Sequence, residues 1–289
     1  VDKKGMTWTF HLREGVRFHD DYPVNANAVK YSIERQIEKK GKGISYFDFV
    51  FAYLDRIEVV DDLTLRIFLK RPYAPFLTYL AMPFSAPVVS PQGVEKFKEK
   101  FGRNPVGTGP FVFESWEGSD IILKANNSYW KGKVNIDKVI FRVMKNSKER
   151  LNSLRKGEVD ILEVDESMGI EKLMEDPNVM FLASPSSDMN FIALRCNRWP
   201  FSDRRLRLAL SYGLKREELV KKLYPFNAFL ASSSLPSNLF GYSAKAQLYP
   251  YDSMEAKKLL KSAGYEKGFS FTLLCYFSER PYNPLKGYT

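Results

Sequence analysis

The segment Asn104-Pro-Val-Gly-Thr-Gly-Pro-Phe111 constrains the fold of this 289-residue chain more than any other feature. Its two prolines restrict the backbone, and its two glycines permit the positive φ angles that tight turns use. We therefore predict a rigid, hinge-like elbow formed by Gly107, Thr108, Gly109 and Pro110. Glycine-rich turns more often shape the backbone than bind a ligand, so both roles stay open for this segment.

The N-terminal third alternates between strand and helix patterns. Residues 7–13 alternate apolar and polar side chains, which is typical of a half-buried strand. Residues 26–37 carry apolar side chains at helical spacing behind a capping asparagine. Residues 57–60 and 63–69 flank the pair Asp61-Asp62 and predict a β-hairpin.

The later patterns predict an alternation of strands and helices. They predict helices at residues 76–82, 94–101, 148–156, 203–224 and 252–263, and strands at 111–113, 121–123, 139–143, 159–162 and from residue 269. Gly157 stands in the C-terminal position of the helix at 148–156. The order strand, helix, strand over residues 139–162 is the unit of an α/β sheet, in which ligands bind at strand ends.

Cysteine, histidine and apolar content limit the classes of protein to consider. No run of about 18 apolar residues occurs, so we predict no membrane span. Two cysteines are too few for a disulfide framework. His11 and His19 lie too far apart for a shared metal, so we predict no metal site. Aromatic residues reach 15% of the chain, which leaves aromatic surface for a binding cleft.

The net charge of +10 lies almost wholly in the last third of the chain. Residues 187–289 carry 16 Lys and Arg against 8 Asp and Glu. No nucleic-acid recognition motif accompanies this excess, and the interleaved stacking aromatics of such binders are missing from the sequence. We interpret the excess as a solvated basic face and predict no nucleic-acid partner.

Seven stretches together carry a resemblance to a known family. They are residues 7–20, 59–77, 104–111, 126–133, 150–161, 200–210 and 251–273. In order and spacing they resemble the signature stretches of the dipeptide, oligopeptide and nickel-type solute-binding proteins of ABC importers, family 5 of the bacterial extracellular solute-binding proteins. Two positions depart from the pattern: Asp21 stands where glycine is common, and Lys215-Arg216 replaces the usual Asp-Arg.

The resemblance implies an α/β fold of the periplasmic-binding-protein type II, with two lobes and an inserted extra domain. Residues 1–90 would be part of the extra domain, 91–186 part of the first lobe, and 187–289 the start of the second lobe. It also implies a fragment that lacks the N-terminal start and the C-terminal portion. The residues that pair with the ends of a bound peptide are then expected after Thr289.

The implied function is a receptor that captures short peptides between its lobes and delivers them to the permease subunits of an ABC importer. Such a receptor acts as a monomer without a cofactor, in the periplasm or as a cell-surface lipoprotein. Another solute, such as a nickel chelate, haem or an oligosaccharide, is the alternative within the class. A hydrolase using carboxylates among residues 158–165 is a third reading, but no nucleophile elbow or phosphate loop supports it, and we predict no catalytic residue.

Eight positions are the predicted ligand contacts: Tyr46, Phe47, Met82, Phe84, Glu163, Asp165, Asn190 and Phe191. The first four lie where the resemblance places loops of the extra domain that reach the cleft. Glu163 and Asp165 follow the predicted strand at 159–162, and the last two stand at the predicted crossing into the second lobe. Aromatic residues in a chain this rich in phenylalanine can equally be core residues.

Overall fold

The computed structural model describes residues 1–38, 49–82, 85–164, 173–184, 186–224, 228–243, 245 and 249–274. The chain divides into two compact units, Val1–Lys145 (unit 1) and Asn146–Thr289 (unit 2). The division into three parts expected from the resemblance stays a prediction. Among the described helices, none has both the length and the apolar character needed to cross a membrane.

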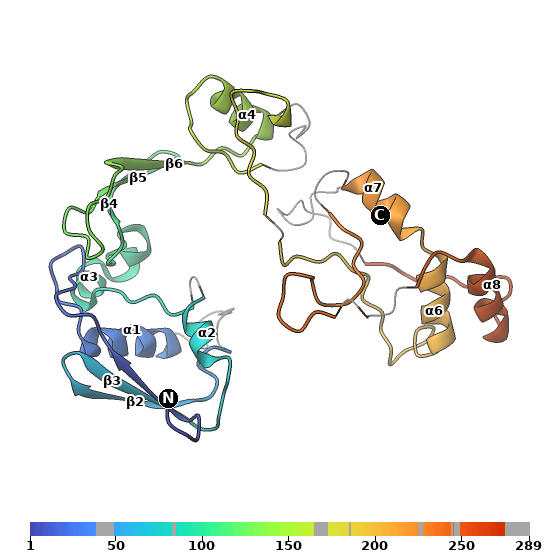
Figure 1. Ribbon diagram of the computed structural model, residues 1–289, viewed down its shortest axis with the longest axis horizontal. Helices are drawn as coiled ribbons and strands as arrows, with labels where there is room; N and C mark the ends of the chain where they lie inside the picture. The colour runs from blue at the N-terminus through green and yellow to red at the C-terminus, as the bar shows by residue number, and fades with distance from the viewer. Residues whose placement is uncertain are drawn as a thin grey trace. The chain divides into compact units, whose positions relative to one another are not determined.

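Unit 1 begins with a three-stranded antiparallel sheet in the order β1-β3-β2. Its strands are β1 (Thr7–His11), β2 (Leu54–Asp61) and β3 (Thr64–Leu69), and helix α1 (Ala26–Glu38) lies against the sheet (Figure 1). Leu65, Ile67 and Leu69 alternate along β3 and are all buried, because successive side chains of a strand point to opposite faces. They form one core with Phe76 and with Ile33 of α1.

The predicted hairpin is confirmed. Strands β2 and β3 pair antiparallel from Leu54 and Leu69 to Asp61 and Thr64. The Asp61 carboxylate closes the turn by accepting a hydrogen bond from the Leu63 amide at 2.9 Å. Hydrogen bonds from backbone amides, first that of Leu63, lower the pKa of Asp61. The acidic turn residue therefore has a structural role that its position in the sequence predicts.

A second antiparallel sheet completes unit 1, in the order β4-β5-β6. The elements before and within it are α2 (Phe76–Leu80), α3 (Pro91–Phe97), the 3-10 helix η1 (Lys98–Arg103), β4 (Phe111–Glu117), β5 (Asp120–Ala125) and β6 (Lys138–Arg142). Ser90 caps α3 by accepting a hydrogen bond from the Gly93 amide at 3.0 Å. The same hydroxyl donates to the Asp20 carboxylate at 2.6 Å, which ties α3 to the segment after β1.

The regular elements in the described part of unit 2 are helices. It contains α4 (Ser147–Arg155), α6 (Arg204–Gly213), α7 (Arg216–Leu223) and α8 (Ser253–Ser262). Asn146, Asp203 and Asp252 each cap the helix that follows them, as the sequence favours at these positions. Helices α6 and α8 pack together through small and apolar side chains, with Leu206, Ala209 and Ala256 buried.

Two predicted strands are wrong, and one predicted helix is divided into two. Residues 159–162 and 269–274 form no strand, and Ile161 and Leu274 are each 91% exposed. A strand is stabilised by pairing, and among the described residues no other strand pairs with either segment. The helix predicted over 203–224 is divided at Leu214, which has an extended backbone (φ −90°, ψ 122°). Its extended ψ interrupts the i to i−4 ladder, so α7 begins anew.

Candidate functional site

The predicted elbow at residues 107–110 is held in place by the side chain of His19. The His19 amide donates to the Gly107 carbonyl at 2.9 Å. The ring nitrogens of His19 contact the Gly109 carbonyl (Nε2, 3.0 Å) and the Gly107 amide (Nδ1, 3.5 Å). The neutral tautomer with its proton on Nε2 satisfies both contacts, since Nδ1 then accepts and Nε2 donates. One imidazole thus bridges both glycines of the turn.

Two residues from the loop after β5 also hold this turn. The Trp130 indole N–H donates to the Thr108 carbonyl at 3.1 Å. The Asn126 side-chain amide donates to the Gly109 carbonyl at 3.1 Å, and its backbone amide donates to the Pro110 carbonyl at 2.8 Å. Three of the seven signature stretches therefore meet at one turn.

The expected use of positive φ at this turn is wrong. The glycines with positive φ do not include Gly107 or Gly109, and a Cβ at either position would meet no atom within 4 Å. The turn is fixed instead by the hydrogen bonds to its carbonyl and amide groups. This positioning role of His19 and Trp130 was missed, although both lie in stretches that carry the resemblance.

Replacing His19 with alanine is expected to lower the free energy of unfolding by about 1–3 kcal/mol, because it leaves polar groups of the turn without partners. Chemical denaturation followed by circular dichroism measures this change. His11→Ala is the matched control: His11 is exposed and makes one described hydrogen bond, from Nδ1 to the Thr64 hydroxyl. Equal losses for the two variants would contradict a specific role of His19 at the turn.

Only one of the four predicted contacts in unit 1 lies within the described residues. Met82 follows α2, and its amide donates to the Tyr79 carbonyl at 3.2 Å. Its own carbonyl accepts a hydrogen bond from the Ser85 hydroxyl at 2.7 Å. Tyr46, Phe47 and Phe84 lie outside the described residues.

Aromatic rings gather around the end of α2, close in sequence to Met82. The Tyr73 and Tyr79 ring centroids are 5.7 Å apart, and Phe49 meets Tyr79 edge-on at 4.9 Å. Tyr53 meets Tyr73 at 4.7 Å. Burial raises the pKa of the Tyr73 hydroxyl, and its hydrogen bond with Tyr79 raises the pKa further. The high aromatic content of the sequence predicts that such a cluster forms, but it does not identify the residues that take part.

The predicted contacts of unit 2 are surface residues where they are described. Glu163 is exposed, and Phe191 keeps 78% of its surface accessible. The Asn190 side-chain amide donates to the Tyr224 hydroxyl at 2.9 Å. Asp165 lies outside the described residues. Their role as ligand contacts stays a prediction.

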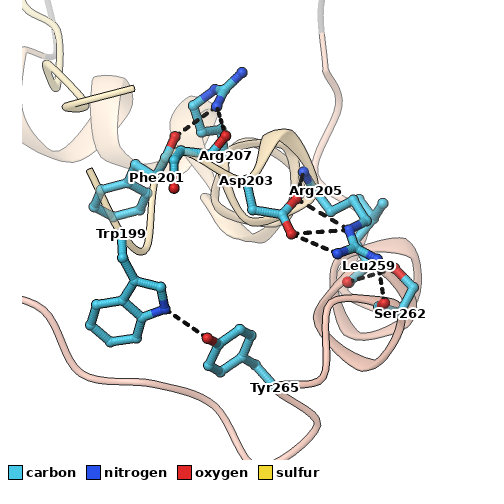
Figure 2. A network of polar contacts seen from close by, with 9 residues as sticks. Trp199, Phe201, Asp203, Arg205, Arg207, Leu259, Ser262 and Tyr265 are labelled. Atoms are coloured by element: carbon cyan, nitrogen blue, oxygen red, sulfur yellow. Dashed lines mark hydrogen bonds and ion pairs between the residues drawn. The ribbon is translucent and has the colours of Figure 1, made fainter. Parts of the chain in front are cut away.

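A polar network joins the stretches 200–210 and 251–273 in unit 2 (Figure 2). The Asp203 carboxylate accepts three hydrogen bonds from the Arg205 guanidinium, the shortest at 2.7 Å, and these hold the pKa of Asp203 below its usual value. Arg205 also donates to the Ser262 carbonyl at the end of α8. The Trp199 indole donates to the Tyr265 hydroxyl at 2.6 Å. Both contacts are structural. Arg205 ties α6 to the end of α8, and Trp199 ties the segment before α6 to the segment after α8.

Within the ranges that the structure describes, no group of three or more His, Cys, Asp and Glu residues could hold a metal ion. The polar contacts around the elbow and around α6 serve to position backbone.

Comparisons with known proteins give relatives over nearly the whole chain. The dipeptide-binding protein of Escherichia coli (strain K12) is 32% identical over 304 residues, which cover 98% of this chain and 57% of that protein. The glutathione-binding protein GsiB of Pectobacterium atrosepticum is 33% identical over 275 residues, covering 94% and 53%. The chain thus spans just over half the length of these curated relatives.

A solved structure has the same fold. The ABC transporter-associated periplasmic binding protein DppA from Helicobacter pylori, in complex with the peptide STSA, superposes with a TM-score of 0.76 at 31% identity. The alignment covers 93% of this chain and 56% of that one. The fold is therefore that of the type II periplasmic binding proteins, as predicted. Residues 1–285 match the bacterial extracellular solute-binding proteins, family 5 Middle, and the chain belongs to this family.

Proposed function

We propose that this chain belongs to a substrate-binding receptor of an ABC importer, which captures short peptides and delivers them to membrane permease subunits. The observation that carries the proposal is the 32% identity with a dipeptide-binding protein over 98% of the chain. The peptide complex of a structural relative supports the same class of ligand. The receptor acts as a monomer, outside the cytoplasm, either free in the periplasm or anchored as a lipoprotein, and it catalyses no reaction.

The side chains of Glu163, Asn190 and Phe191 in unit 2 are exposed, which suits their predicted role as ligand contacts. An exposed carboxylate and amide can orient a peptide, and an exposed ring can cover its apolar part. Met82, Tyr46, Phe47, Phe84 and Asp165 complete the proposed set. Binding of this kind needs oriented polar groups and aromatic surface, and no reactive residue.

Glutathione is the second candidate ligand, because a glutathione-binding protein is 33% identical over 94% of the chain. It is itself a short peptide with an additional carboxylate. The basic excess of residues 187–289, with 16 basic against 8 acidic side chains, favours an anionic ligand in general.

Incubation with millimolar dipeptide is expected to raise the melting temperature of the complete receptor that contains this chain. A ligand that binds only the folded state stabilises it by about 2.7 kcal/mol at one hundred times its Kd. Differential scanning calorimetry with Ala-Ala, glutathione and free amino acids separates the candidates. Mass spectrometry of the recovered peptide then shows whether it stays intact.

Three outcomes would contradict the receptor proposal. The first is no shift with any peptide, and the second is cleavage of the peptide during incubation. The third is tight binding of a duplex oligonucleotide that weakens steeply with salt, which is the behaviour of a protein that neutralises phosphates. A shift with glutathione and none with Ala-Ala would keep the receptor class and change the ligand.

A further inference from the structure

The second sheet of unit 1, β4-β5-β6, has one face made of apolar side chains alone. Residues that stand opposite one another in an antiparallel sheet point to the same face, so the register assigns each side chain to a face. Three rows across the strands form this apolar face: Trp116 with Ile121 and Phe141, Phe113 with Leu123 and Val139, and Phe111 with Ala125.

The opposite face of the same sheet carries the charged side chains. Ion pairs join Arg142 to Asp120 at 2.8 Å and Lys138 to Glu114 at 3.6 Å. Lys124 stands opposite Lys138 in the register and is exposed. An antiparallel sheet with one polar and one apolar face ordinarily turns the polar face to water and packs the apolar face on a core.

The apolar face of the second sheet is accessible. Phe141 is 57% exposed and Trp116 is 41% exposed, and none of the eight side chains of this face is buried. In the first sheet, by contrast, Leu65 and Ile67 lie in a core that α1 completes, and each is 1% exposed. The two hydrophobic cores described for unit 1 contain no residue of the second sheet. The Arg103 guanidinium lies 4.4 Å from the Trp116 ring centroid, at one end of the face.

Size and charge argue against a separate partner on this face. Strands of five to seven residues, about 4.8 Å apart with a rise of about 3.3 Å per residue, give the face an area of about 300 Å². A stable complex of two separate chains buries about 800 Å² on each partner, so a second copy of this chain would need more surface than the face offers. A surface that binds anionic lipid places basic side chains beside its apolar ones, whereas Lys124, Lys138 and Arg142 lie on the other face.

A segment of the same polypeptide needs no such area, because its attachment keeps it at a high effective concentration. The match covers 57% of the dipeptide-binding protein of Escherichia coli and 53% of the glutathione-binding protein of Pectobacterium atrosepticum, so more than two fifths of each relative lies outside it. We infer that an apolar segment of the complete receptor, from outside residues 1–289, docks on the apolar face of the second sheet. This inference goes beyond the proposed function and does not depend on the ligand.

Photo-crosslinking of the complete receptor tests which segment covers the face. The photoreactive derivative p-benzoylphenylalanine replaces Phe141, and mass spectrometry after irradiation and digestion identifies the crosslinked peptide. The expected product is a crosslink within one molecule to a peptide from outside residues 1–289. The same derivative at Lys124 is the matched control, because Lys124 is exposed on the polar face of the same sheet, and this crosslink should be lost. A crosslink from position 141 to a second receptor molecule, crosslinks to residues 1–289 alone, or no crosslink would each overturn the inference.

Aspartate at the same two positions gives a second measurement. Phe141→Asp is expected to lower the melting temperature of the complete receptor by about 5 °C or more, because the docked segment would bury the new carboxylate. Lys124→Asp should change it by less than about 2 °C, as is usual for a surface position. Equal shifts for the two variants would show that position 141 stays in water and would overturn the inference. Peptide binding by the wild-type receptor is measured separately, so failure of the docking surface leaves the receptor proposal intact, and the reverse also holds.

Discussion

Phe76→Ala is expected to lower the free energy of unfolding by about 3–5 kcal/mol, the usual cost of removing a buried phenylalanine ring. Phe76 is 0% exposed, begins α2 and belongs to the core beneath the first sheet. Its ring centroid lies 5.7 Å from that of Trp8 on β1. The cavity would therefore open between the helix and the strand, with loss of an aromatic contact as well as of buried area.

Urea denaturation followed by Trp fluorescence measures this loss. Leu77→Ala is the control on the same helix, since Leu77 is 51% exposed and its truncation should cost less than about 1 kcal/mol. Similar values for the two variants would contradict the assignment of Phe76 to the core.

Gly93→Ala is expected to destabilise unit 1 by about 1–3 kcal/mol, the usual cost of overpacking. A Cβ at Gly93 would lie 2.9 Å from both the Cβ and Cγ2 atoms of Val106, and 3.4 Å from the Asp20 carboxylate. Gly93 has no positive φ, so helix propensity alone would favour alanine by about 1 kcal/mol. The clash is expected to outweigh that gain, because Val106 is only 9% exposed and cannot move away freely.

A double-mutant cycle with Val106→Gly separates the clash from other effects. Val106→Gly removes both atoms that the new Cβ would meet, so Gly93→Ala should cost less in that background. Gly102→Ala is the control, because a Cβ there meets no atom within 4 Å. Additive free energies in the cycle would show that the predicted clash with Val106 does not exist.

The elements that depend on local pattern were predictable from the sequence. Alternation along residues 64–69 gave β3, and the spacing of residues 26–37 gave α1. Gly157 adopts φ 69° at the end of α4, as its position predicts. Asp21 replaces the common glycine yet keeps a positive φ of 62°, which aspartate tolerates better than most residues.

Features that depend on partners distant in sequence were not predictable in this way. The β-rich composition of residues 159–162 favoured a strand, but a strand needs a neighbour, and composition does not reveal one. The helix pattern of residues 203–224 likewise did not disclose the break at Leu214.

The candidate site shows the same difference between features set by local sequence and features set by distant partners. The resemblance drew attention to residues 107–110, whereas the contacts that hold them come from His19, Asn126 and Trp130. The aromatic rings around Tyr79 come from residues 49–53 and residues 73–79, so no single stretch of sequence predicts the cluster. Six of the eight predicted ligand contacts lie outside the described residues or are exposed without a described side-chain bond, and their role as ligand contacts stays a prediction.

The bond between His19 and Gly109 joins residues 90 positions apart. Closing so long a loop costs chain entropy, and contacts between residues distant in sequence slow folding. Strands β2 and β3 of the first sheet and helix α1 lie within that loop, and their formation shortens the effective distance between its ends. The turn at 107–110 should therefore acquire its final shape late, after the first sheet has formed, so a newly made chain has its core before it has its elbow.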